Sequence, residues 1–171
     1  MQKKFNKILV ANRGEIAIRI FRACAELGIK SVGIYSKEDK YSLFRTKADE
    51  SYLIGEDKGP IDVYLDMDGI IALAKEKNVD AIHPGYGFLA ENSEFVRKCE
   101  ENGIAFIGPS ADIMDKMGDK INSKKVAHAA DVPTIPGVDK VIETVEEAKK
   151  VADYVGYPVM VKASNGGGGR G

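Results

Sequence analysis

The sequence predicts an α/β fold in which a Rossmann-like parallel sheet comes first and the beginning of a second domain follows. Short apolar runs bounded by turn residues recur along the first two thirds of the chain, as expected of buried strands. Segments with apolar residues at helical spacing separate these runs. A strand, a helix and a second strand fit into residues 7–35, and a unit of that size requires a right-handed crossover and a parallel sheet.

Five strands are expected in the first domain. Each is a run of four or five residues that is mostly apolar, and each ends at glycine, proline or a polar turn. The strands are expected at residues 7–11, 31–35, 51–54, 79–83 and 104–107.

The helices between these strands carry their own start and stop signals. In residues 15–27 apolar side chains recur every three or four positions, and Gly28 ends the helix. Asp66 is suited to cap a helix that runs to about residue 78. A short helix is expected at residues 42–47 and a longer one at residues 91–102.

The first domain is expected to occupy residues 1–111, and residues 112–171 open a second one. Thr144 is suited to cap the last helix. The apolar run at residues 159–161 predicts a buried strand that leads into the glycine-rich end of the sequence. The helices expected after the first domain span residues 111–117, 119–130 and 144–155.

Composition excludes several classes of function. The chain has 171 residues and a formal net charge of −1, with 44% apolar and 30% charged residues, as in globular proteins. No basic field indicates a nucleic-acid partner, and no apolar run approaches the roughly 20 residues that cross a bilayer. We therefore expect a cytoplasmic protein without nucleic-acid or membrane partners. Cys24 and Cys99 lack metal-ligand spacing and are expected to be reduced thiols on helices.

The strongest functional signal is the glycine-rich stretch at residues 156–171. Lys162 follows the apolar run, and four consecutive glycines come next: Gly166, Gly167, Gly168 and Gly169. Glycine lets a backbone approach a ligand closely, and successive N–H groups form an anion-binding concavity. A lysine beside such a loop adds a charge suited to phosphate. The pattern predicts a flap over nucleotide phosphates, and the alternative is a flexible glycine-rich tail.

Lys120 is a second nucleotide candidate. It would lie in the first turn of the helix at residues 119–130, where the helix dipole disfavours a cation. A bound anion would offset that cost. The alternative is an ordinary exposed lysine.

The loops after the first and fourth strands lie where open α/β sheets bind ligands, outside the carboxyl ends of the strands. His83 and Tyr86 are therefore candidates, although a histidine at a strand end is more often structural. The first turn holds a single glycine, and Glu15 would oppose a pyrophosphate there, so a dinucleotide-binding module is not expected. Arg13 is expected to form a structural ion pair rather than to bind an anion.

Two arginines mark the outer face of the first helix. Arg19 follows Glu15 by four residues and Arg22 precedes Glu26 by four, so ion pairs can form along the helix.

Five segments, in family order and covering nearly the whole chain, resemble the amino-terminal part of biotin carboxylases, which are ATP-grasp enzymes. They are NRGEIA at 12–17, HPGYGFL at 83–89, FIGP at 106–109, MGDK at 117–120, and VKA with GGGGRG at 161–171. Within the family, residues 34–39, 47–50 and 59–65 look more like the pyruvate carboxylases than the biotin carboxylase subunit of acetyl-CoA carboxylase, which is the alternative.

The resemblance implies a pre-ATP-grasp domain followed by the opening of an ATP-grasp domain. It implies that Mg-ATP and bicarbonate give carboxyphosphate, which carboxylates biotin on a carrier domain. In the pyruvate carboxylases, carboxybiotin then converts pyruvate to oxaloacetate. The ligands implied are ATP, Mg²⁺, bicarbonate and the biotinylated carrier domain.

The resemblance also implies roles for individual residues. Lys120 and Lys162 match ATP-contacting lysines, and the glycines at 166–169 match a lid that closes over the phosphates. Asn165 stands where many members have glycine. The residues expected on the border of the biotin pocket are Tyr86 and Gly87, and those expected at a dimer interface, hence in a homo-oligomer, are Arg19 and Arg22.

The family's metal-binding glutamates, bicarbonate-binding residues, catalytic base and biotin-contacting arginine all correspond to positions after residue 171. No catalytic residue and no metal ligand is therefore assigned in this chain. We expect an amino-terminal fragment of a longer carboxylase that is inactive alone.

Other functions remain open. One is a different ATP-grasp ligase, of the carbamoyl-phosphate or purine-biosynthesis type, against which the segments at 12–15 and 83–87 argue. The other is a non-catalytic module that dimerises through the Arg19 and Arg22 face.

Overall fold

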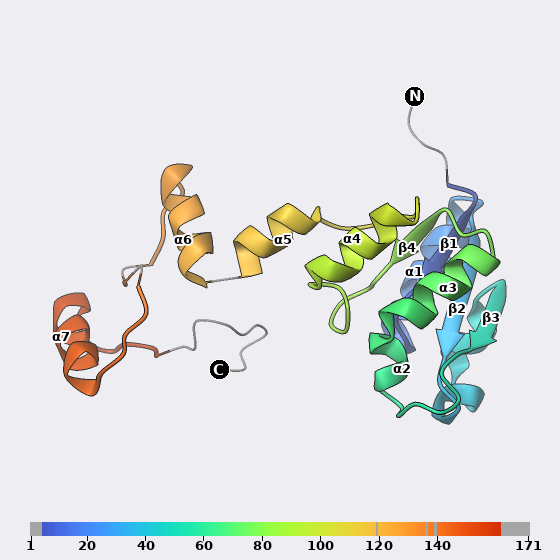
Figure 1. Cartoon of the computed structure of the whole chain (residues 1–171), viewed down its shortest axis with the longest axis horizontal. Helices are drawn as coiled ribbons and strands as arrows, with labels where there is room; N and C mark the ends of the chain where they lie inside the picture. The colour runs from blue at the N-terminus through green and yellow to red at the C-terminus, as the bar shows by residue number, and fades with distance from the viewer. Residues whose placement is uncertain (1–4, 119, 136, 139, 162–171) are drawn as a thin grey trace. The chain divides into compact units, whose positions relative to one another are not determined.

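The computed structural model describes residues 5–118, 120–135, 137–138 and 140–161. The chain divides into two compact units, residues 1–111, here called unit 1, and residues 112–171, called unit 2 (Figure 1). Each unit is described by itself.

Unit 1 is an α/β domain built on one five-stranded sheet, which confirms the predicted fold class. All strand pairs are parallel, and the strand order is β3-β2-β1-β4-β5. In the central strand, Leu9 lies in register with Val32 on one side and Ile82 on the other. The strands are β1 (Lys7–Val10), β2 (Lys30–Tyr35), β3 (Glu50–Leu53), β4 (Ala81–His83) and β5 (Ala105–Phe106).

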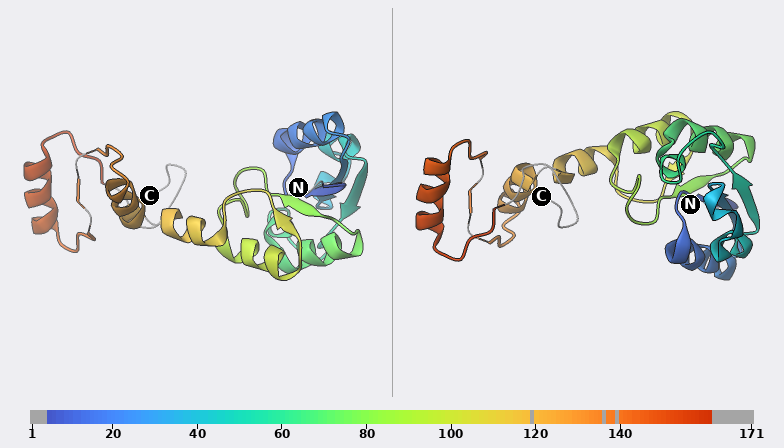
Figure 2. Two further views of the ribbon diagram at one scale, coloured as in Figure 1. Left: turned by 90° about the horizontal axis from the view of Figure 1, so that it is seen from above. Right: turned by 90° about the horizontal axis from the view of Figure 1, so that it is seen from below.

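Helices cover both faces of this sheet. Figure 2 shows α1, in blue, on one face and the green helices α3 and α4 on the other. The helical elements of unit 1 are α1 (Gly14–Glu26), the 3₁₀ turns η1 (Glu38–Tyr41) and η2 (Leu43–Lys47), α2 (Asp62–Leu65), α3 (Met67–Glu76) and α4 (Ser93–Glu101).

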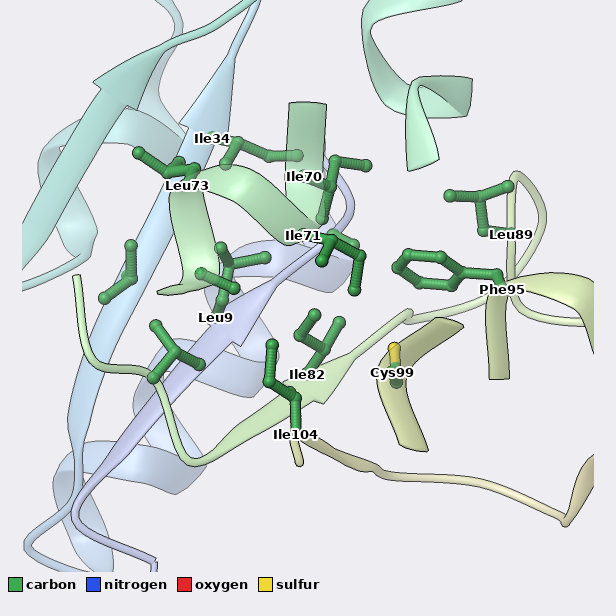
Figure 3. Packing of buried hydrophobic residues seen from close by; sticks show 14 of the residues in the cluster. Leu9, Ile34, Ile70, Ile71, Leu73, Ile82, Leu89, Phe95, Cys99 and Ile104 are labelled. Carbon is green, nitrogen blue, oxygen red and sulfur yellow. The ribbon is translucent and has the colours of Figure 1, made fainter. Parts of the chain in front are cut away.

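The alternation of side chains along β1 produces two hydrophobic layers, because successive residues of a strand point to opposite faces. Ile8 and Val10 pack with Phe21 and Cys24 of α1. Leu9 packs on the opposite side, with residues of α3 and α4. Figure 3 shows this second layer, whose labelled members are Leu9, Ile34, Ile70, Ile71, Leu73, Ile82, Leu89, Phe95, Cys99 and Ile104.

The two cysteines are buried free thiols, as predicted. Cys24 lies on α1 and Cys99 on α4. Burial raises the pKa of Cys24, and it raises the pKa of Cys99 to about 12. Both thiols are therefore protonated near neutral pH and serve as small apolar side chains.

Several boundaries differ from the predictions. The predicted helix at 42–47 is the 3₁₀ turn η2, preceded by a second turn, η1, that was not expected. The short helix α2 was also missed, because four residues after a proline show no full helical period. The helix predicted from residue 91 begins at Ser93, because the Asn92 side chain accepts a hydrogen bond from the Phe95 amide and caps it.

Three helices follow in the described part of unit 2: α5 (Ala111–Gly118), whose first residue is the last of unit 1, α6 (Lys120–Ala129) and α7 (Val145–Val155). The Thr144 side chain caps α7 by accepting a hydrogen bond from the Glu147 amide, as predicted.

The buried strand predicted at residues 159–161 is wrong for this structure. The three residues form no strand, and Met160 and Val161 are 80% and 84% exposed. An apolar run is buried as a strand only when a neighbouring strand pairs with it, and the described residues of unit 2 contain no strand.

The helices described here are too short or too polar to cross a bilayer.

Candidate functional site

The most promising site in unit 1 lies at the carboxyl-terminal ends of the neighbouring strands β1 and β4. The chain runs outward from β1 through β2 to β3, and then returns to place β4 on the other side of β1. The strand order thus reverses between β1 and β4. Open α/β sheets bind ligands at such a switch point, outside the carboxyl ends of the strands. The two loops that meet there begin at Asn12 and at Pro84.

Asn12 joins these two loops. Its side-chain amide donates hydrogen bonds to the carbonyl oxygens of Pro84, at 2.7 Å, and Tyr86, at 2.9 Å. Its side-chain oxygen accepts from the Arg13 amide at 2.9 Å. The residue is 3% exposed. Sequence reasoning missed this role, because a polar residue after a strand gives no sign of partners more than 70 positions away.

His83 has a structural role, as histidines at strand ends more often do. Its Nδ1 accepts a hydrogen bond from the Gly85 amide at 3.0 Å, which shapes the start of the loop after β4. Burial lowers the pKa of His83. The neutral ring is therefore favoured, which agrees with its role as acceptor.

Gly85 is needed at its position for two reasons. Its φ is +67°, a conformation that other residues rarely adopt. An added Cβ would also lie 2.7 Å from the Nδ2 atom of Asn12. The backbone of this loop therefore passes directly against the Asn12 amide.

Tyr86 and Gly87 project from the loop into solvent. Tyr86 is 62% exposed, and Gly87 has a φ of +69° with no atom within 4 Å of an added Cβ. The Tyr86 hydroxyl donates to the Glu15 carboxylate at 2.7 Å, which raises the pKa of Tyr86. The two residues predicted to border a biotin pocket are thus accessible at the switch point.

Phe88 anchors the far end of the same loop. Its ring stacks on the buried ring of Tyr64, with centroids 5.2 Å apart. The loop is therefore held at His83, at Asn12 and at Phe88, and its exposed apex is Tyr86.

Arg13 forms the structural ion pair that was expected. Its Nη1 lies 3.2 Å from Oδ2 of Asp39, and the Tyr64 hydroxyl donates to the same oxygen at 2.7 Å. Burial alone would raise the pKa of Asp39, but the hydrogen bonds from Tyr64, Ser42 and Arg13 outweigh it and lower that pKa. Arg13 and Asp39 line an open cavity of about 430 Å³, in which the guanidinium charge is already balanced.

Arg19 and Arg22 lie exposed on α1. Neither makes a hydrogen bond or ion pair with another residue of the described ranges. The pairs anticipated along the helix are therefore absent there, and Glu15 accepts from Tyr86 instead. Among the described residues of unit 1, no acidic side chain forms an ion pair with either guanidinium group.

Of the residues predicted to bind a nucleotide, only Lys120 lies within the described ranges. Lys120 is the first residue of α6, which agrees with the prediction that it lies in the first turn of this helix. Lys162 and the glycines at 166–169 lie outside the described residues. Among the residues described, no three His, Cys, Asp or Glu side chains gather closely enough to hold a metal ion.

Two family models match consecutive parts of the chain. Residues 4–114 match the biotin carboxylase N-terminal domain, and residues 119–171 match the ATP-binding domain of the carbamoyl-phosphate synthase large chain. The second match begins immediately before α6.

Similar proteins of known function are longer than this chain. Pyruvate carboxylase of Bacillus subtilis is 58% identical over 170 residues, and mitochondrial pyruvate carboxylase of Homo sapiens is 52% identical over 169 residues. The 2-oxoglutarate carboxylase small subunit of Hydrogenobacter thermophilus is 55% identical over 167 residues. Each match covers 98–99% of this chain, but it spans only 15%, 14% and 35% of these relatives, respectively.

Solved structures have the same fold. One is the biotin carboxylase domain dimer of Hydrogenobacter thermophilus 2-oxoglutarate carboxylase, in complex with MgADP, ADP and bicarbonate. It is 54% identical with a TM-score of 0.91, covering 99% of this chain and 37% of that one. Another is the Campylobacter jejuni biotin carboxylase in complex with a β,γ-ATP compound, at 47% identity and a TM-score of 0.91, covering 98% and 37%.

Proposed function

The chain belongs to the family of the biotin carboxylase N-terminal domain, and on that premise we propose that it supplies one part of an ATP-dependent biotin carboxylase. The observation that carries the proposal is the order of the two matched domains, at residues 4–114 and 119–171. Unit 1 then corresponds to the pre-ATP-grasp domain, and unit 2 to the opening of the ATP-grasp domain. This order argues against a free-standing dimerisation module.

The nucleotide side of the proposed site lies in unit 2. Lys120 and Lys162 would place positive charge against ATP phosphates, and the glycines at 166–169 would offer backbone N–H groups as a closing lid. The position of Lys120 at the start of α6 supports this assignment. Mg²⁺ would neutralise phosphate charge, and its ligands are not found among the described residues.

The biotin side lies in unit 1, at the loop after β4. Tyr86 and Gly87 would border the pocket for biotin carried on a separate carrier domain. Their exposure at the switch point between β1 and β4 supports that role. Phosphoryl transfer needs metal ligands, and no cluster of metal-ligating side chains is found within the described ranges, so we propose that the 171 residues alone are inactive.

The acceptor of the carboxyl group is proposed to be pyruvate. Identities of 58% and 59% with two bacterial pyruvate carboxylases support it. 2-Oxoglutarate is the second candidate, because the 2-oxoglutarate carboxylase small subunit is 55% identical.

We propose a homo-oligomer in which α1 presents Arg19 and Arg22 to a second copy. The dimer of the Hydrogenobacter thermophilus domain and the exposure of both arginine side chains on α1 support it. We also propose a cytoplasmic location, consistent with two free thiols, although three mammalian relatives are mitochondrial.

A chimaera tests the nucleotide assignment. This chain replaces the 170 matching residues of Bacillus subtilis pyruvate carboxylase, and bicarbonate-dependent ATP cleavage is measured. Lys162→Ala and Lys120→Ala are expected to raise the KM for ATP at least about tenfold, the loss of one charge-assisted contact. Lys149→Ala, an exposed residue of α7, is the matched control. Unchanged KM values in both lysine variants would refute the assignment.

A further inference from the structure

Asn12 is the polar residue that holds the centre of the loop after β4. Buried asparagines in turns usually bond to backbone groups a few residues away. Asn12 instead donates to the carbonyls of Pro84 and Tyr86, 72 and 74 residues along the chain. These two carbonyls flank Gly85, whose backbone lies so close to the Asn12 amide that a methyl group would not fit.

The other loop contacts act at different points. The bond of His83 to the Gly85 amide shapes the beginning of the loop, and the stacking of Phe88 on Tyr64 holds its end. The bond from the Tyr86 hydroxyl to Glu15 is exposed to solvent, where water competes for both partners. Asn12 is 3% exposed, so loss of its donors leaves carbonyl groups without a partner at a site that water enters poorly.

We propose that Asn12 is a positioning residue for the biotin side of the site, fixing the Pro84–Tyr86 backbone so that Tyr86 and Gly87 stand at the switch point. This inference rests on the proposed function. Within unit 1, Asn12 acts through the loop after β4. Its loss therefore weakens the use of biotin and leaves the use of ATP intact.

The test is Asn12→Asp in the chimaera. The aspartate side chain has nearly the same shape and still accepts from the Arg13 amide, but it offers no N–H donor and sets a negative charge against two carbonyls. Ser31→Ala is the matched control. Ser31 is 2% exposed, and its hydroxyl makes two bonds with Asp49, at 2.7 and 3.0 Å, at the opposite end of the sheet.

With free biotin as substrate, Asn12→Asp is expected to raise the KM for biotin at least about tenfold, as the loss of one buried and one partly buried hydrogen bond implies. The KM for ATP in bicarbonate-dependent cleavage stays within about twofold, and Ser31→Ala changes neither value. A KM for biotin that stays unchanged, or that rises together with the KM for ATP, would overturn the proposal. So would the same rise in Ser31→Ala.

A second readout separates this proposal from the proposed function. In the 171-residue chain, hydrogen exchange is measured at the amides of Gly85 and Ala90, which are bonded to His83 and to the Gly87 carbonyl. Asn12→Asp is expected to speed both at least about tenfold relative to Ser31→Ala. Equal rates would refute the positioning role. If the unsubstituted chimaera fails to carboxylate biotin while exchange is accelerated, the proposed function fails and the loop contact stands.

Discussion

Replacing Tyr64 with phenylalanine tests the buried network beside the switch point. The Tyr64 hydroxyl donates to Asp39 at 2.7 Å and accepts from the Ser36 amide at 3.3 Å, and the ring is fully buried. A hydrogen bond to a charged group contributes about 1.5–3 kcal/mol, and the longer bond to Ser36 adds less. Arg13 continues to pair with Asp39. Tyr64→Phe is therefore expected to lower the free energy of unfolding of unit 1 by about 2 kcal/mol.

The assay uses the two cysteines of the chain, both of which are buried in unit 1. Pulsed thiol labelling at increasing urea concentration reports the unfolding of unit 1 without interference from unit 2. Tyr52→Phe is the control, because its hydroxyl also donates to a carboxylate, Glu50, at 2.8 Å but at a more exposed position. A loss below about 0.5 kcal/mol for Tyr64→Phe, or an equal loss for Tyr52→Phe, would refute the reasoning.

The same variant has a predicted pH dependence. The pKa of Asp39 is lowered in the folded protein, so its contribution to stability is present above the unfolded pKa of about 3.9 and is lost as the pH falls through the folded value. Tyr64→Phe removes one of the bonds that lower this pKa. The stability difference between the two proteins should therefore be constant above about pH 5 and shrink as the pH falls below about 3.9. A difference that stays constant as the pH falls below about 3.9 would contradict the assignment.

Three further predictions concern other contacts. Gly85→Ala forces a Cβ against Asn12 at a φ of +67° and should cost unit 1 about 1–3 kcal/mol in the thiol-labelling assay, whereas no change would show that the loop relaxes freely. Thr144→Ala removes the cap of α7 and should destabilise that helix by about 1 kcal/mol, seen as faster exchange of the Glu147 amide, and unchanged exchange would argue against the cap. Alkylation of Cys99, whose pKa is about 12, and of Cys24 should proceed at pH 8 only at the rate of unfolding, and faster labelling of the native chain would disprove their burial.

Much of unit 1 follows from local patterns in the sequence. The strands are short apolar runs, and α1 has a clear helical period, so their order, type and parallel arrangement could be predicted. The observed helix boundaries differ from the predicted ones where a side-chain cap sets them. The Asn92 cap, for example, starts α4 at Ser93 instead of residue 91. The elements that were missed, α2 and η1, are four residues each and are too short to show a period.

The candidate site was only partly predictable. The exposed Tyr86 and Gly87 and the start of α6 at Lys120 lie where sequence motifs indicated. The contacts of Asn12 and Asp39 were not foreseen, because their partners are brought close only by the packing of distant loops. The apolar run at 159–161 has the composition of a strand, but burial depends on a partner strand that local sequence does not specify.

Carboxylation of free biotin by the chimaera tests the central claim most directly. Incorporation of labelled bicarbonate into carboxybiotin is expected to require MgATP, to occur at a rate within about tenfold of the parent Bacillus subtilis enzyme, and to fall at least about tenfold with Lys162→Ala. A chimaera that has the sedimentation coefficient and thermal stability of the parent but forms no carboxybiotin would contradict the claim that this chain belongs to a biotin-carboxylating site.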